Sequence, residues 1–131
     1  MKKYTLFAGV ICSVLLFGSC RKESCSAGTG GNYALKIYPQ HHGEAIPGSV
    51  AYVEFNTQSS PGALSEFDMK AEAEPGSDYI SLNNMRCGDY YIYCVGIDDD
   101  GITTEIVRGG IPFSVPDGAG GLVKIYVPVT E

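Results

Sequence analysis

Hydrophobic and polar residues alternate through much of the chain after residue 32, which is the period of a β-strand with one buried face. In segment 33–38, for example, Leu35 and Ile37 share one face and Lys36 lies on the other. Similar runs, rich in β-branched and aromatic residues, recur at short intervals and are separated by turn-forming pairs such as Pro47-Gly48. We therefore predict strands over residues 33–38, 49–56, 69–73, 79–82, 89–97, 105–108, 111–115 and 122–129.

These strands predict an all-β fold. The region has no convincing helical period, and 17 glycines and 7 prolines in the chain disfavour helices. Without crossover helices a parallel sheet is not expected, so we predict a single antiparallel Greek-key β-sandwich of seven to eight strands. In the last strand Lys124 belongs in water, which turns the opposite face inward. The predicted inward residues are Tyr33, Leu35 and Ile37; Ala51, Val53 and Phe55; Tyr90, Ile92 and Cys94; and Val123, Ile125 and Val127.

The N-terminus has the pattern of an export signal. Lys2 and Lys3 precede an uncharged run over residues 6–17, which is long enough for a signal peptide and too short to span a membrane. The run ends in Leu16-Phe17-Gly18-Ser19-Cys20, which resembles the bacterial lipobox. We expect a lipoprotein signal peptide over residues 1–19, cleaved before Cys20, and lipidation of Cys20, including a palmitate-type acyl chain. An ordinary secretory peptide or an uncleaved anchor are the alternatives.

The residues after Cys20 bear on location and domain organisation. Arg21 stands where lipoproteins of one well-studied type carry an aspartate that retains them in the inner membrane, so the outer membrane is expected. Residues 24–32 are small, polar and rich in glycine, a composition typical of flexible spacers. The predicted organisation is a lipidated N-terminus and linker over residues 20–32 and a sandwich domain over 33–131.

The charge and length of the mature chain limit the classes of partner that it is expected to bind. Removal of the signal would leave 112 of the 131 residues, with seven Lys and Arg against fifteen Asp and Glu, a net charge of −8. An acidic chain without a basic cluster is not expected to bind nucleic acid. The membrane, through the lipid, and an envelope protein or glycan are the expected partners.

Three cysteines would remain besides the lipidated one, so at most one pair can form within the chain. If the chain is extended from Gly88 to Ile97, the seven residues from Cys87 to Cys94 hold the two cysteines over about 20 Å apart, too far for a disulfide. Cys25 could reach Cys87 from the linker, and the sequence leaves this pairing open. Cys94 is expected to be a free, buried thiol.

A family resemblance is carried by residues 42–53, which include Ile46-Pro47-Gly48, by Leu82, and by Gly88-Asp89-Tyr90. These segments resemble the transthyretin-like (prealbumin-like) domains, most closely the carboxypeptidase regulatory-like group. The resemblance implies a β-sandwich that carries no catalytic residues of its own. Independently of any family, Tyr90 stands where its phenol can bond to nearby backbone, in the manner of a tyrosine corner.

Candidate chemistry centres on His41 and His42. Adjacent side chains of an extended segment point to opposite sides, so the pair is not expected to hold one metal ion, and no C-x₂₋₄-C pair supplies further ligands. A polar loop is the favoured interpretation. The acidic run 98–100 is interpreted as a solvated hairpin turn, and no G-x-S-x-G elbow is present. We expect no enzyme activity, no cofactor and no metal.

Aromatic residues offer the better indication of function. Tyr91 and Tyr93 are expected on the outer face of their strand and Tyr52 on the outer face of another, where they could recognise protein or glycan or simply cover the sheet. Two hypotheses follow. The first is a non-catalytic, lipid-anchored envelope protein that binds a protein or glycan through Tyr52, Tyr91 and Tyr93. The alternative is a lipoprotein that handles a metal or small ligand through the loop of His41 and His42.

Overall fold

A computed structural model of the chain describes residues 25–131, which form two four-stranded sheets packed face to face. The predicted signal peptide and Cys20 lie outside the described residues. The elements are β1 (Thr29–His41), β2 (Glu44–Ala45), β3 (Val50–Phe55), η1 (Leu64–Glu66, a 3-10 turn), β4 (Met69–Glu72), β5 (Ile80–Met85), β6 (Gly88–Asp99), β7 (Thr104–Val115) and β8 (Gly121–Pro128). Within residues 25–131, no helix has the length and apolar character needed to cross a membrane.

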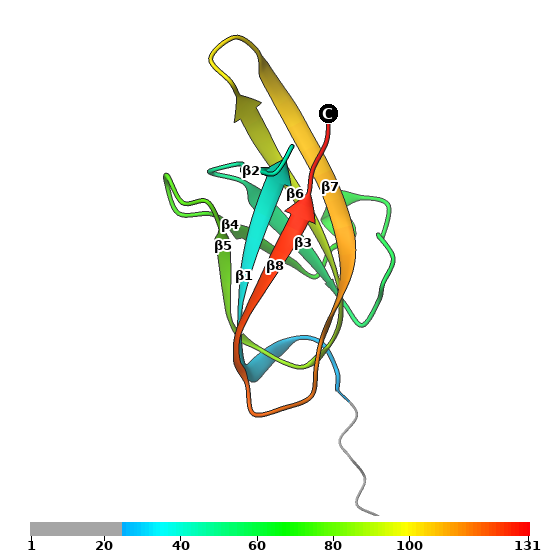
Figure 1. The fold of residues 1–131 in the computed structure, drawn as a ribbon. Helices are drawn as coiled ribbons and strands as arrows, with labels where there is room; N and C mark the ends of the chain where they lie inside the picture. The colour runs from blue at the N-terminus through cyan, green and yellow to red at the C-terminus, as the bar shows by residue number, and fades with distance from the viewer. Residues whose placement is uncertain (1–24) are drawn as a thin grey trace, which may run out of the picture.

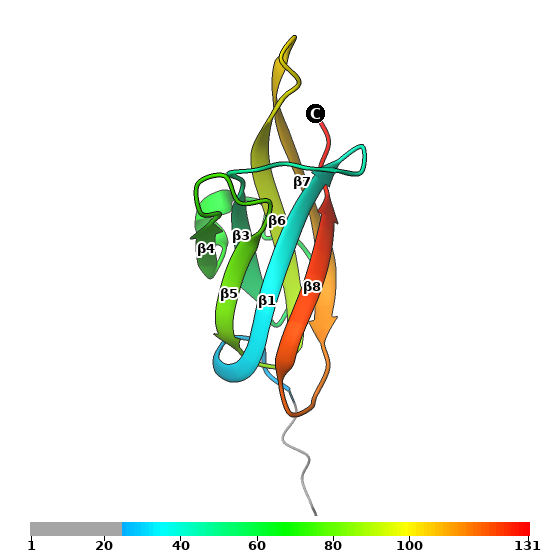
Figure 2. The same ribbon diagram turned by 60° about the vertical axis from the view of Figure 1, so that its left-hand side comes forward.

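The sheet topology confirms the predicted all-β sandwich (Figures 1 and 2). In the first sheet β1 lies between β5 and β8, and the short β2 pairs with its end. The second sheet has the order β4-β3-β6-β7, with every pair antiparallel. One pair departs from the antiparallel prediction, because β1 and β8 run parallel. The chain enters β8 from β7 in the other sheet and not through a hairpin with β1, so the two directions need not oppose each other.

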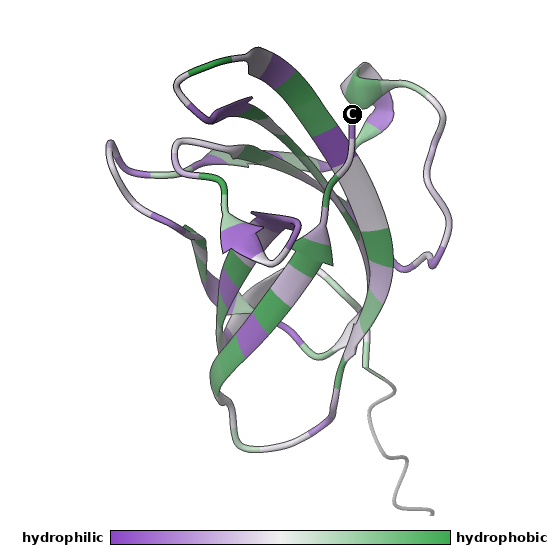
Figure 3. Cartoon of the chain, turned by 45° about the horizontal axis from the view of Figure 1, so that its top comes forward, coloured by the Kyte–Doolittle hydropathy of each residue, from purple (hydrophilic) through white to green (hydrophobic). Residues whose placement is uncertain are grey.

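The core lies between the sheets and has the composition that the alternation predicts. Most of the predicted inward side chains of β1, β3, β6 and β8 are buried, whereas Lys36 is half-buried and Lys124 is exposed. Figure 3 shows hydrophobic and hydrophilic residues alternating along the strands. Phe55 and Val123 are only partly buried at the margin of this core. At about 1.5–3 kcal/mol for each fully buried large side chain, this cluster is the main stabilising contribution.

The segment predicted as two strands, 105–108 and 111–115, is one continuous strand, β7. Gly109 and Gly110 are paired with Cys94 and Tyr93 across the sheet and do not turn the chain. A Cβ atom at Gly109 would overlap the Pro128 carbonyl of β8, so glycine serves close backbone approach at this position. The prediction of two separate strands was wrong for that reason.

Strands β6 and β7 form a long hairpin that ends in the predicted polar turn. Oδ1 of Asp100 accepts hydrogen bonds from the backbone N–H groups of Ile102 (2.8 Å) and Thr103 (2.7 Å). These bonds hold the pKa of Asp100 below its ordinary value. The hairpin tip lies at the same end of the sandwich as the C-terminus, and the described chain begins at the opposite end (Figure 1).

The linker predicted over residues 20–32 is wrong from Cys25 onward, because these residues belong to the fold. Strand β1 begins at Thr29 and Ala27 is buried. A backbone hydrogen bond also holds this segment to the fold, since the Arg86 N–H donates to the Gly28 carbonyl at 2.8 Å. Small residues here allow the segment to pass close to the β5–β6 turn, as a Cβ atom at Gly88 would overlap Ala27.

The predicted backbone bonding of the Tyr90 phenol is confirmed. The ring is fully buried at the start of β6, and its hydroxyl donates to the Arg86 carbonyl at 2.7 Å. The same oxygen accepts a hydrogen bond from the Gly28 N–H at 3.0 Å. Burial raises the pKa of Tyr90 above its ordinary value. One side chain thus fixes both the β5–β6 turn and the N-terminal segment.

Candidate functional site

The first candidate site is on the outer surface of the second sheet. Tyr52 and Tyr93 are direct cross-strand partners of β3 and β6, and both are half-buried. Phe67, which follows η1, packs over them with ring centroids 5.8 Å from Tyr52 and 6.1 Å from Tyr93. We call Tyr52, Phe67 and Tyr93 the aromatic face. Phe67 was missed from the sequence because it lies in a long polar connection without periodicity.

Tyr91 lies on the same outer surface but is positioned differently. It precedes Tyr93 by two residues on β6, so the two side chains share one side of the sheet. A Cβ atom at Gly110 would lie only 2.9 Å from a ring carbon of Tyr91. The Tyr91 ring therefore packs directly over Gly110. Its ring therefore covers the β7 backbone.

A hollow of about 420 Å³ adjoins the aromatic face and is lined by Leu64, Phe67, Tyr93, Val95, Ile106 and Arg108, together with two small residues. Val95 and Ile106 also line a neighbouring apolar hollow of about 370 Å³ that reaches Ile97. Ile97 and Ile106 are 60% and 57% exposed. Exposed apolar side chains gathered in one patch are a feature of interaction sites.

Arg108 supplies a positive charge beside this apolar surface. It pairs through its backbone with Thr130, which fixes its position on β7. Among residues 25–131, its guanidinium forms no ion pair within 4 Å. A carboxylate from outside the chain would therefore have a partner here.

The second candidate site contains both histidines, and here the sequence-based geometry was wrong. His41 ends β1 and His42 follows with φ of 51°, so the chain is not extended at this point. The left-handed turn brings the imidazole rings together, with centroids 4.1 Å apart, instead of placing them on opposite sides. Nδ1 of His41, which is 8% exposed, lies 2.6 Å from Oδ2 of Asp98 on β6. We call His41, His42 and Glu131 the histidine cluster.

Glu131 completes this cluster from the end of the chain. One potential ligand atom from each of its three residues lies within 4.8 Å of the others. Several carboxylates share the adjoining polar hollow of about 270 Å³, which is lined by Asp98, Asp100, Thr103 and Glu105 as well as the cluster itself. The hydrogen bond and negative charge of Glu131 raise the pKa of Glu105 above its ordinary value. Glu131 was missed because it lies 89 residues from His42 in sequence.

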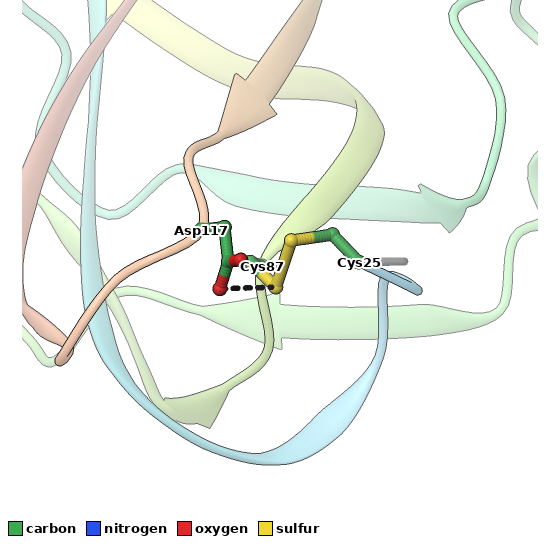
Figure 4. A group of neighbouring side chains, drawn as sticks. All are labelled: Cys25, Cys87 and Asp117. Atoms are coloured by element: carbon green, nitrogen blue, oxygen red, sulfur yellow. Dashed lines mark hydrogen bonds between the residues drawn. A yellow bond between two sulfur atoms is a disulfide. The ribbon is translucent and has the colours of Figure 1, made fainter. Parts of the chain in front are cut away.

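The cysteine pairing left open by the sequence is settled in the structure. Cys25 and Cys87 form a disulfide, with Cα atoms 5.0 Å apart, beside the start of β6 (Figure 4). Asp117 lies next to it, with Oδ1 3.9 Å from Sγ of Cys87. Both sulfurs are used in the disulfide, so this group offers no thiolate to a metal in its oxidised form.

Cys94 is the free, buried thiol that the sequence predicts. It faces the core from β6, and burial raises its pKa to about 12. The thiol is therefore protonated at neutral pH and is inaccessible to substrate. Cys94 is not a nucleophile candidate.

Comparisons with models of protein families, with curated proteins and with solved structures found no match. Function is therefore inferred from the residues and their geometry. Within the part of the chain that the structure describes, the aromatic face and the histidine cluster are the two places that combine exposure with a defined arrangement of functional side chains.

Proposed function

We propose that this chain is a non-catalytic, lipid-anchored envelope protein whose sandwich domain binds a protein partner through the outer surface of the second sheet. The observation that carries the proposal is the aromatic face beside an exposed apolar surface with Arg108, which has no ion-pair partner among residues 25–131. The anchor is the predicted lipid on Cys20, and the outer membrane is the proposed location.

The disulfide supports a short tether. Four residues lie between Cys20 and Cys25, and the five Cα–Cα steps of a fully extended chain reach at most about 18 Å. Because Cys25 is covalently fixed to Cys87, the end of the sandwich where the described chain begins would stay close to the bilayer. The β6–β7 hairpin tip and the histidine cluster would then face away from the membrane.

A protein partner fits the surface better than a glycan does. Sugar sites place polar side chains around an aromatic ring, whereas Val95, Ile97 and Ile106 extend the aromatic face with aliphatic side chains. Tyrosine and arginine at the centre of an apolar patch are typical of protein interfaces. The expected binding segment presents apolar side chains and a carboxylate that reaches Arg108.

The transthyretin-like resemblance is retained within this proposal. Gly48, with φ of 68°, follows Pro47 in the turn before β3, and Tyr90 bonds to the backbone at the start of β6. Both features support a carboxypeptidase regulatory-like module, a class that acts through binding rather than catalysis.

Tyr93→Ser is expected to weaken partner binding at least tenfold, because it removes a ring that packs against Phe67 and lines the hollow. The measurement is the recovery of one reproducible protein with the tagged full chain from crosslinked envelopes. Tyr126→Ser is the matched control, since Tyr126 is an exposed tyrosine on the other sheet. Arg108→Glu should reproduce the loss without changing the packing of the aromatic face.

Two results would overturn this proposal. The first is equal recovery of the same partner with Tyr93→Ser and Tyr126→Ser. The second is saturable binding to a glycan array that Tyr93→Ser abolishes, since the ligand would then be a sugar.

A further inference from the structure

The histidine cluster has a feature that a solvated polar loop does not need, namely a buried imidazole held by a carboxylate. The distance of 2.6 Å between Nδ1 of His41 and Oδ2 of Asp98 fits an N–H donated to the carboxylate. In the neutral ring this bond leaves the lone pair on Nε2. Metal-binding histidines are commonly oriented by such a carboxylate, which also increases the basicity of the ligand nitrogen.

The backbone around this imidazole fixes the other two groups. The left-handed conformation of His42 turns its ring onto His41. Next to Glu131, Thr130 exchanges two backbone hydrogen bonds with Arg108, at 2.8 and 2.9 Å, and the Val129 N–H donates to Gln40 at 2.9 Å. The backbone that carries the Glu131 carboxylate is therefore held beside the histidines by these hydrogen bonds.

We propose that His41, His42 and Glu131 bind one divalent transition-metal ion of the Zn²⁺ class, with Asp98 as the positioning residue for His41. Two imidazoles and a carboxylate suit Zn²⁺ and its neighbours, whereas Ca²⁺ and Mg²⁺ prefer oxygen ligands throughout. Three protein ligands leave one position of a tetrahedral ion open. A hollow of about 500 Å³ along His42, Tyr126 and Glu131 gives that position room for water or an external ligand.

Distance and charge are consistent with this site. Ligand atoms around tetrahedral Zn²⁺ lie about 3.3 Å apart, given bonds of about 2.0–2.1 Å. The separations of up to 4.8 Å in the cluster can close by movement of the exposed His42 and Glu131 side chains while His41 stays fixed. The carboxylates of Asp98, Asp100 and Glu105 add negative charge around the cation.

No thiol among the described residues competes for the ion. Cys25 and Cys87 are joined in the disulfide, and Cys94 is buried in the core. Zn²⁺ binding to the oxidised protein should therefore depend on the histidine cluster. The site is also separate from the aromatic face, so metal binding and partner binding can be tested independently.

The test is calorimetric titration of Zn²⁺ into the full chain in detergent at neutral pH. We expect one ion per chain, at least a tenfold loss of affinity in His42→Gln and in Glu131→Gln, and about a tenfold loss in Asp98→Asn. Glu74→Gln is the control, because it removes one exposed carboxylate outside the cluster and should change affinity less than twofold. In a parallel NMR titration, the side-chain resonances of both histidines should shift together at one equivalent.

Two results would overturn the proposal. One is the absence of saturable Zn²⁺ binding by the wild-type chain when circular dichroism shows that it is folded. The other is stoichiometric binding that His42→Gln and Glu131→Gln leave unchanged. His42 and Glu131 are exposed, so their replacement should not unfold the protein. Neither result bears on partner binding at the aromatic face.

Discussion

Replacing Cys25 and Cys87 together by serine is expected to lower the free energy of unfolding by about 2–4 kcal/mol. The disulfide joins residues 62 positions apart, so it removes many conformations from the unfolded chain. Total stabilities of small domains are about 5–15 kcal/mol, so the loss is a large fraction of the whole. Urea denaturation followed by circular dichroism measures it directly.

Reductant supplies the control for this prediction. Wild-type protein in reductant should unfold at the same urea concentration as the double variant, which separates loss of the bond from any effect of the serines. The remaining contacts of the segment, such as the 2.8 Å bond from the Ala27 N–H to Asn56, are expected to keep the native fold. A change below about 1 kcal/mol would show that the disulfide does not stabilise the fold as argued.

Tyr90→Phe is expected to lower the free energy of unfolding by about 1–3 kcal/mol, although only one oxygen atom is removed. The lost hydroxyl would leave the buried Gly28 N–H and the part-buried Arg86 carbonyl without this partner. Tyr91→Phe is the matched control. Tyr91 is the neighbouring, half-buried tyrosine on the other side of the sheet, and its change should stay within about 0.5 kcal/mol. Equal effects of the two substitutions would contradict the assigned role of Tyr90.

The alternation of hydrophobic residues was sufficient to predict the sandwich, because each strand has one buried side. It identified the buried sets, such as Leu35 with Ile37 and Tyr90 with Ile92, and it placed Cys94 in the core. The prediction failed at glycine, which occurs both in turns and inside strands where another group packs closely against the backbone. Gly109 and Gly110 resemble a turn in sequence, but in the structure they allow close approach of β8 and of the Tyr91 ring.

The start of the fold was also missed from the sequence, because small polar residues have the composition of a spacer whether or not they are ordered. Here Cys25 is held by Cys87, and Gly28 by Tyr90 and Arg86. All of these contacts join residues about 60 positions apart. Contacts between residues so far apart in sequence cannot be predicted from local composition.

The candidate sites were predicted only in part. Tyr52, Tyr93 and the two histidines could be identified by residue type and strand alternation. Phe67, Arg108, Asp98 and Glu131 could not, since each reaches its site through tertiary packing. The geometry of the histidines was wrong because the prediction assumed an extended chain, whereas His42 has a positive φ.

Site-specific photo-crosslinking in intact cells tests the central claim most directly. A photoreactive residue would replace Ile106, which is 57% exposed beside the aromatic face, or Leu122, which is 54% exposed on the other sheet. We predict one reproducible protein adduct from position 106, lost when Arg108→Glu is added, and no such adduct from position 122. The same adducts from both positions, or none from position 106, would contradict binding through this face.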